Sequence, residues 1–205
     1  MVHDLFVVHD GLAAAARFPS LSRHPRRISV LEVALLLGCG AAAAALSGFV
    51  KLRLGIPGHS IVLAALPMAL GLSLAPRRGA GALVSAGALG SASMLAFAGA
   101  SFGSGSFASL TLLGPMMDLA LRGVNSGGFR VYGALVLSGV ITNLLALASR
   151  AGSKLLGLDV GGRPFDGWWL QAMVTYTLAG LIAGLLGAVC WFHVRRRSPD
   201  RQQQP

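Results

Sequence analysis

The sequence predicts an all-α membrane protein, a bundle of about six transmembrane helices. Hydrophobic residues make up 54% of the chain and charged residues only 12%. The mean hydropathy of +0.69 is outside the range of soluble domains. Apolar runs of about 20 residues match the length that a helix needs to cross a bilayer, and unpaired backbone groups in lipid require these runs to be helical. The runs are residues 28–50, 59–75, 79–102, 106–121, 131–149 and 167–193. The second and fourth are short, which leaves five or seven crossings open.

Lys and Arg residues gather on one set of connections and on both tails. Because cytoplasmic loops carry an excess of cations, this distribution predicts that both termini are cytoplasmic. The predicted inner cations are Arg17, Arg23, Arg26, Arg27, Arg77, Arg78, Arg122, Arg130, Arg195, Arg196, Arg197 and Arg201; the outer ones are Lys51, Arg53, Arg150, Lys154 and Arg163. The chain therefore divides into a cytoplasmic or interfacial segment (1–27), a transmembrane domain (28–193) and a basic, disordered tail (194–205).

The net charge of +10 does not predict nucleic-acid binding, because the basic residues are spread over connections and flanks rather than gathered on one face. Anchoring to anionic lipid explains them better, and the turn that carries Arg77 and Arg78 is interpreted in this way. The only two cysteines, Cys39 and Cys190, are predicted at different depths, so we expect no disulfide.

Small residues crowd several of the predicted helices. On the first helix they form a continuous stripe, which either docks a partner subunit or packs inside the bundle. The stripe consists of Gly38, Ala41, Ala42 and Ala45. In the third helix we expect the small residues to pack internally.

Polar and aromatic residues gather near the predicted outer ends of the helices. Pro57 and Gly58 predict a turn after an extended first outer loop. A buried amide such as Asn143 or Gln171 needs a partner in lipid, either another helix or a ligand. The candidate ligand contacts are Arg53, His59, Thr142, Asn143, Trp168, Trp169, Gln171, Thr175 and Tyr176. Trp168 and Trp169 are also typical of an interfacial aromatic belt, and His59 of a helix start.

Asp118 is the one carboxylate well inside a predicted span. An intramembrane acid is a functional candidate. However, Arg122 follows it by four residues, a spacing that favours an ion pair on one helix face over a proton relay.

Three patterns resemble the substrate-binding S component of energy-coupling factor (ECF) uptake transporters. They are Ala41-x-x-x-Ala45 on the first helix, the Lys51 to Ser60 loop, and the Pro76 to Gly81 turn; the stretch from Gly114 to Asp118 is similar in character to the family's fourth helix. The resemblance implies capture of a vitamin-like small molecule from outside. It also implies transfer through a membrane coupling (T) subunit driven by separate ATPase subunits.

The sequence contains no phosphate-binding loop of the type that hydrolyses ATP, and no catalytic constellation within the predicted spans. We therefore expect no enzyme activity and no cofactor. His3 and His9 raise the alternative of nickel or cobalt delivery, which a cytoplasmic position argues against, so no metal site is predicted. The modest polarity of the candidate contacts favours a neutral or weakly anionic aromatic ligand. The alternative function is a structural scaffold or assembly protein without a ligand.

Overall fold

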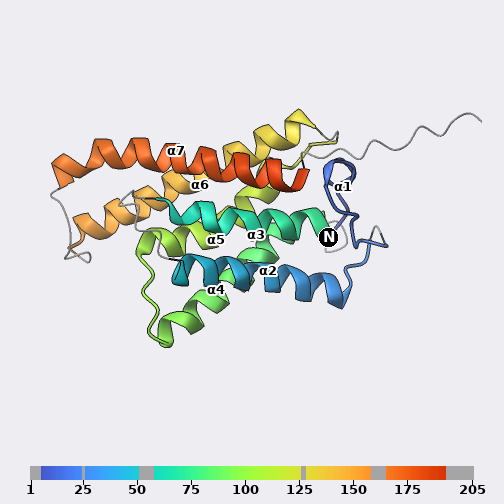
Figure 1. The fold of residues 1–205 in the computed structure, drawn as a ribbon, viewed down its shortest axis with the longest axis horizontal. Helices are drawn as coiled ribbons and strands as arrows, with labels where there is room; N and C mark the ends of the chain where they lie inside the picture. The colour runs from blue at the N-terminus through green and yellow to red at the C-terminus, as the bar shows by residue number, and fades with distance from the viewer. Residues whose placement is uncertain (1–5, 25, 51–57, 126–127, 158–164, 193–205) are drawn as a thin grey trace, which may run out of the picture.

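The computed structural model describes residues 6–24, 26–50, 58–125, 128–157 and 165–192. Within this part of the chain all regular elements are helices, shown in Figure 1. They are α1 (Asp10–Ala15), α2 (Val30–Phe49), α3 (Ser60–Leu74), α4 (Ala80–Phe97), α5 (Ser104–Ala120), α6 (Phe129–Leu155) and α7 (Phe165–Phe192). The predicted all-helical architecture is confirmed, and each predicted span coincides with one of α2 to α7.

Four helices are long and apolar enough to cross a membrane: α2, α4, α6 and α7. The two runs that the sequence marked as short became α3, with 15 residues, and α5, with 17 residues. At a rise of about 1.5 Å per residue, these two helices are roughly 22 and 25 Å long. The finding supports a multi-pass membrane protein.

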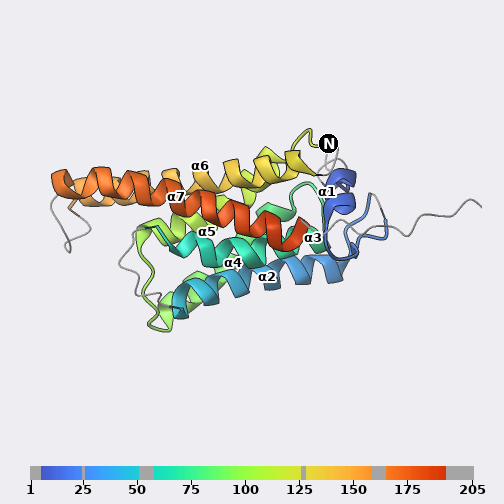
Figure 2. The same ribbon diagram turned by 45° about the horizontal axis from the view of Figure 1, so that its top comes forward.

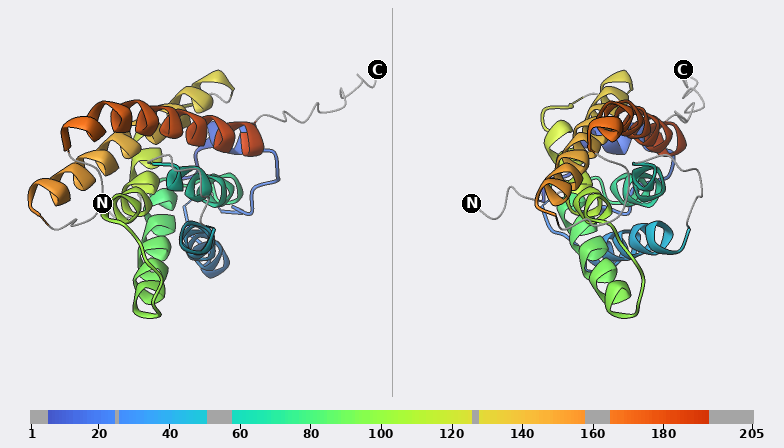
Figure 3. Two further views of the ribbon diagram at one scale, coloured as in Figure 1. Left: turned by 60° about the vertical axis from the view of Figure 1, so that its left-hand side comes forward. Right: turned by 90° about the vertical axis from the view of Figure 1, so that its left-hand side faces the viewer.

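The six helices α2 to α7 form a closed ring. Going round it, each helix packs against the next in the order α2, α4, α5, α6, α7 and α3, and α3 packs back against α2. The end-on views in Figure 3 show this arrangement. Ring neighbours are therefore not always sequence neighbours, since α2 packs on α4 and α3 packs on α7.

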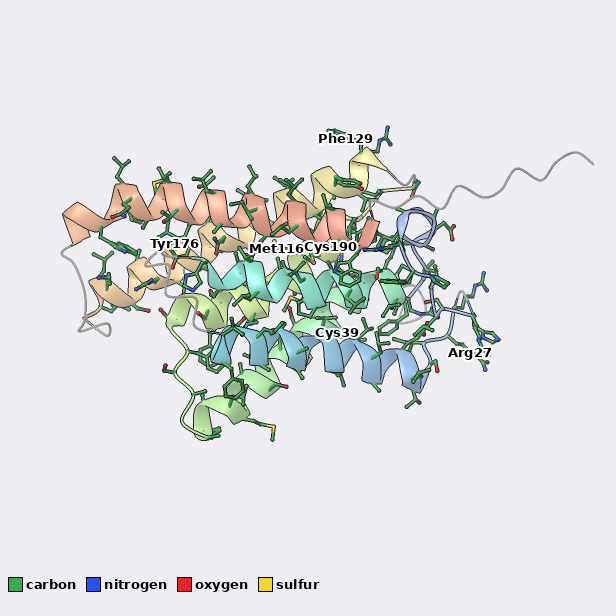
Figure 4. The ribbon with its side chains drawn as sticks, viewed as in Figure 1. Arg27, Cys39, Met116, Phe129, Tyr176 and Cys190 are labelled. Carbon is green, nitrogen blue, oxygen red and sulfur yellow. The ribbon has the colours of Figure 1, made fainter. Side chains whose placement is uncertain are left out.

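Figure 4 shows Cys39 and Cys190 on two different helices, α2 and α7, and both are free thiols.

Glycines allow three of these helix pairs to approach backbone to backbone. A Cβ on Gly139 of α6 would lie 2.5 Å from the carbonyl oxygen of Gly180 of α7. A Cβ on Gly40 of α2 would collide with the backbone of α4, and one on Gly114 of α5 with that of Gly81 of α4. Gly81, Ser85 and Gly87 of α4 therefore pack internally, as the sequence predicts, because close approach is how membrane helices gain packing energy. The prediction does not hold for Gly99 and Gly103 beyond the end of α4, which are exposed and where a Cβ would meet nothing within 4 Å.

Residues 6–24, which we call the N-terminal strap, cross one end of the bundle. Backbone hydrogen bonds fasten it: the N–H of His9 donates to Pro76 O (2.7 Å), that of Arg17 to Trp191 O (2.5 Å) and that of Leu21 to Leu74 O (2.8 Å). In the opposite direction Arg78 N–H donates to the strap at Val7 O (3.1 Å). Leu12 is buried in the same core as the long helices. We call this end of the molecule the capped end.

The described chain begins and ends at the capped end, because the strap contacts the last turn of α7. The opposite end, where α6 leads back into α7, is the hairpin end; in Figures 1 and 2 the α6–α7 pair extends there beyond the start of α3. The exposed Arg27 lies at the capped end in Figure 4.

The lipid-anchor interpretation is wrong for Arg77, which is only 1% exposed. Its Nε donates to Glu32 Oε2 (3.0 Å) and its Nη2 to Glu32 Oε1 (3.2 Å). Two further donors reach the strap, with Nη1 donating to Phe6 O (2.9 Å) and Nη2 to His24 O (2.8 Å). A guanidinium presents its donors in a fixed fork, so one side chain joins the α3–α4 turn, α2 and both ends of the strap. Arg78, by contrast, is exposed.

The expected ion pair between Asp118 and Arg122 is not formed within the described part of the chain. The Asp118 carboxylate accepts instead from the N–H groups of Gly81 (3.1 Å) and Ala82 (2.9 Å) at the start of α4. The first N–H groups of a helix have no partner inside it, so an acid from α5 caps α4. The tight contact between Gly81 and Gly114 brings the two helices close enough for this bond.

Candidate functional site

The candidate site lies at the hairpin end, where α6 and α7 meet the turn before α3. Asn143 of α6 is fully buried there. Its side-chain Nδ2 donates to Tyr176 O of α7 (2.7 Å) and to Gly58 O (3.4 Å). One amide therefore connects three segments that are far apart in the sequence.

Two buried oxygen atoms at this site have no hydrogen-bond partner in the structure: Oδ1 of Asn143 and Oγ1 of Thr142. Both side chains are 0% exposed. A buried acceptor without a donor costs about 1–3 kcal/mol, and most proteins satisfy such groups. Each of these two buried oxygens is therefore an atom that a donor group from another molecule would stabilise.

Gly58 closes the site against Tyr176. Its φ of +83° is a left-handed conformation, which favours glycine. A Cβ at Gly58 would lie 2.9 Å from Tyr176 Cγ and 3.1 Å from Asn143 Nδ2. The turn that the sequence predicts at Pro57 and Gly58 thus rests directly on the two side chains, although Pro57 itself lies outside the described residues. Figure 4 shows Tyr176 near the start of α3.

The start of α5 completes the surroundings of Tyr176. A Cβ at Gly105 would lie 3.2 Å from the Tyr176 hydroxyl oxygen. Next to it, Ser106 Oγ donates to Ser60 Oγ of α3 (3.4 Å). The starts of α3 and α5 therefore meet at the level of Tyr176 and Asn143.

Trp168 lies nearer the tip of the α6–α7 pair and is 6% exposed. The Arg150 guanidinium carbon is 5.6 Å from its ring centroid and Lys154 Nζ is 5.2 Å from it. These distances fall within the range of cation–π contacts. The contacts place two cations over a buried aromatic ring near the tip. Arg150 and Lys154 are four residues apart, a spacing that puts them on one helix face and could have indicated the cluster from the sequence.

Four of the predicted ligand residues, Thr142, Asn143, Trp168 and Tyr176, are buried on α6 and α7, and Asn143 bonds directly to the backbone of Tyr176. His59 is half-buried at the N-cap of α3, as expected of a helix start. Trp169 and Gln171 lie on the exposed side of α7, apart from Asn143. Arg53 lies outside the described residues. Sequence reasoning did not select Gly105 or Ser106.

The small-residue stripe of α2 does not face the protein's own core. Gly38 and Ala42 are exposed, and Ala41 and Ala45 are half-buried. A Cβ on Gly38 would meet nothing within 4 Å. The residues of α2 that pack inward are Leu36, Gly40, Ala43, Ala44 and Gly48. The stripe is therefore available to a partner or to lipid.

Within the described part of the chain, no group of three or more His, Cys, Asp or Glu residues could hold a metal ion. His3 of the nickel or cobalt alternative lies outside that part. His9 lies in the strap at the capped end, far along the sequence from the residues of the candidate site.

Comparison with known proteins finds no protein family that matches this chain. No curated protein and no solved structure matches it either.

Proposed function

We propose that this chain is a six-span membrane protein of the bacterial cytoplasmic membrane that binds a small molecule at the hairpin end. In this proposal it acts like the S component of an ECF transporter. It captures a vitamin-like molecule from outside and passes it to a membrane coupling subunit driven by separate ATPases. Both termini are cytoplasmic, so the hairpin end faces outward. The chain itself performs no catalysis.

The observation that carries the proposal is the pair of unsatisfied oxygens on Thr142 and Asn143. Buried polar atoms in a membrane bundle are costly unless a partner satisfies them, and a ligand with N–H or O–H groups would do so. The site also has an aromatic wall in Tyr176. The turn at Gly58 covers it and lies against both Tyr176 and Asn143. Pockets that bind small molecules typically combine apolar walls with a few polar groups.

The first experiment identifies the bound small molecule and then tests whether the side chain of Asn143 contributes to its binding. Protein purified in mild detergent is analysed by mass spectrometry for small molecules that copurify, and the binding of the identified compound is measured for variants. Asn143→Leu should weaken binding by about 1–3 kcal/mol, the cost of leaving a ligand donor unpaired.

The matched control is Ser138→Ala, which removes a buried hydroxyl from the same helix. Ser138 Oγ is already satisfied by Leu135 O (2.8 Å), so this change should leave binding unaltered. Equal binding by the wild type and the Asn143 variant would exclude the site. Failure to detect any bound compound would favour the alternative of a structural scaffold.

The orientation has its own test. Tags at residues 1 and 205 should resist an external protease in intact cells, because the cation excess places both ends inside. Cleavage of either tag from outside would contradict the orientation and an outward-facing site.

The coupling partner is proposed to dock on the stripe of Gly38, Ala41, Ala42 and Ala45. Ala42→Trp should block assembly with a coupling subunit and leave the isolated protein folded, because Ala42 is exposed. Ala43→Trp, one residue further along α2, should instead prevent folding, because Ala43 is 0% exposed. Loss of folding in the Ala42 variant would show that the stripe is internal packing.

A further inference from the structure

The N-terminal strap is joined to the bundle at a short antiparallel contact, in which Val8 pairs with Arg77. The bonds from His9 N–H to Pro76 O and from Arg78 N–H to Val7 O flank this pair. Backbone groups, which do not titrate, thus hold the residues on both sides, and the Arg77 side chain adds its bonds to Phe6 O and His24 O. A change in pH can therefore weaken the contact between Val8 and Arg77 only through an ionisable side chain that lies beside it.

His9 is such a side chain. It is 7% exposed, and its ring Nε2 is buried without a hydrogen-bond partner. A neutral imidazole can leave one ring nitrogen unprotonated, whereas the imidazolium carries an N–H donor on both nitrogens. In its present position a charged His9 would bury an unsatisfied donor and a cation. The docked strap therefore requires the neutral ring.

The charged groups around His9 oppose its protonation. Burial lowers the pKa of His9 below its ordinary value, and the nearby Arg78 lowers it further, while Asp10 acts in the opposite direction. The two helices packed against α1 are α3 and α6. Helix α3 has no ionisable side chain, and the nearest ionisable residues at the start of α6 are Arg130 and Tyr132. Glu32 is already bonded to Arg77.

We propose that the N-terminal strap is a pH-sensitive latch, and that protonation of His9 releases it from the capped end. The released histidine has its ordinary pKa of about 6.5, and the docked one has a lower pKa. Docking is therefore strongest above pH 6.5. It weakens as the pH falls, by at most about tenfold per pH unit, until the lower pKa is reached. The latch is independent of whether the hairpin end binds a ligand.

The test measures how often the strap opens. Ala15 is a buried strap residue, 6% exposed, whereas the adjacent Ala14 is exposed. Ala15→Cys and Ala14→Cys are made separately in the full chain with Cys39→Ala and Cys190→Ala, and each is labelled with a water-soluble maleimide between pH 7.5 and 5.5. Dividing the labelling rate of the Ala15→Cys variant by that of the Ala14→Cys variant cancels the pH dependence of the reagent. The resulting ratio reports how often the strap opens.

We expect the ratio to rise severalfold as the pH falls below about 6.5. His9→Asn should abolish the rise, because asparagine does not titrate and is a good helix N-cap residue. Arg78→Gln should reduce it, because the cation that opposes protonation is removed; the Arg78 side chain is exposed and only its backbone holds the strap. A constant ratio in the wild type, or an equal rise in the His9 variant, would overturn the latch. If the His9 variant does not fold, an unchanged response in the Arg78 variant would overturn it as well.

Discussion

Two buried polar side chains, Arg77 at the capped end and Asn143 at the hairpin end, differ in how far their hydrogen-bonding groups are satisfied. At the capped end, Arg77 is fully buried and its donors meet the Glu32 carboxylate and two strap carbonyls. At the hairpin end, Asn143 is equally buried, but only its amide nitrogen is satisfied. A buried charge that meets an opposite charge and several hydrogen-bond partners helps to fix one arrangement of the chain, whereas a partly satisfied group, such as Asn143 or His9 of the strap, is stable only at a cost. The comparison separates a structural joint from a candidate binding site.

Glu32 shows how complete the network at the capped end is. Besides the two bonds from Arg77, its carboxylate accepts from the N–H of Ser29 (2.9 Å) and so forms half of the capping box that starts α2. One acid thus begins a helix and neutralises a buried cation. Substitutions at both ends and at the helix crossing between them should change the free energy of unfolding, measured in mixed micelles, by amounts that reflect this difference.

The largest expected effect is that of Arg77→Met at the capped end. It leaves Glu32 buried without its cation, which typically destabilises a protein by about 3–5 kcal/mol. The double variant Arg77→Met with Glu32→Leu should recover a large part of this loss, because no charge then stays buried. A loss below about 1 kcal/mol in the single variant would contradict the role of Arg77 as a structural joint.

Gly139→Ala tests a region that belongs to neither end, the α6–α7 crossing. The new Cβ would lie 2.5 Å from Gly180 O, so the helices must separate, at a cost of about 1–3 kcal/mol. Gly133→Ala on the same helix is the control. A Cβ there meets nothing within 4 Å, so higher helix propensity should stabilise the protein by up to about 1 kcal/mol. Equal effects of both changes would show that the crossing is not tightly packed.

Asp118→Ala extends the comparison to the cap of α4. It removes the acceptor of two N–H groups at the start of that helix, with an expected loss of about 1–2 kcal/mol. Asp118→Asn keeps one acceptor oxygen and should lose less. Arg122→Gln should have little effect, because Arg122 is exposed. A greater loss in the Arg122 variant than in Asp118→Ala would restore the ion-pair interpretation.

Thr142→Val has the smallest expected effect on the free energy of unfolding, and it should stabilise the protein rather than destabilise it. It replaces an unsatisfied buried hydroxyl with a methyl group of similar shape, so the protein without ligand should gain up to about 1 kcal/mol of stability. A clear loss of stability would mean that the hydroxyl is satisfied in the folded protein. The hairpin end would then resemble the capped end, and the main support for a ligand site would be gone.

Local patterns in the sequence were sufficient to predict the helices and part of the candidate site. The length of an apolar run determines whether a helix can span a bilayer, so the runs predicted all of α2 to α7, including the short α3 and α5, but not α1. The polarity of Asn143 within an apolar run identified it as a residue in need of a partner. The turn at Gly58 follows from its neighbouring proline and the conformational freedom of glycine.

The partners that these residues meet depend on how the whole chain is packed. Glu32 and Arg77 are 45 positions apart, and Phe6 and Arg77 are 71 positions apart. Their contact depends on the order of helices in the ring and on the path of the strap, neither of which a local pattern contains. Spacing on one helix suggested that Asp118 pairs with Arg122, but the glycine contact between α4 and α5 brought backbone donors closer. Propensity and hydropathy act over a few residues, whereas the pairing of buried polar groups is determined by the packing of the whole bundle.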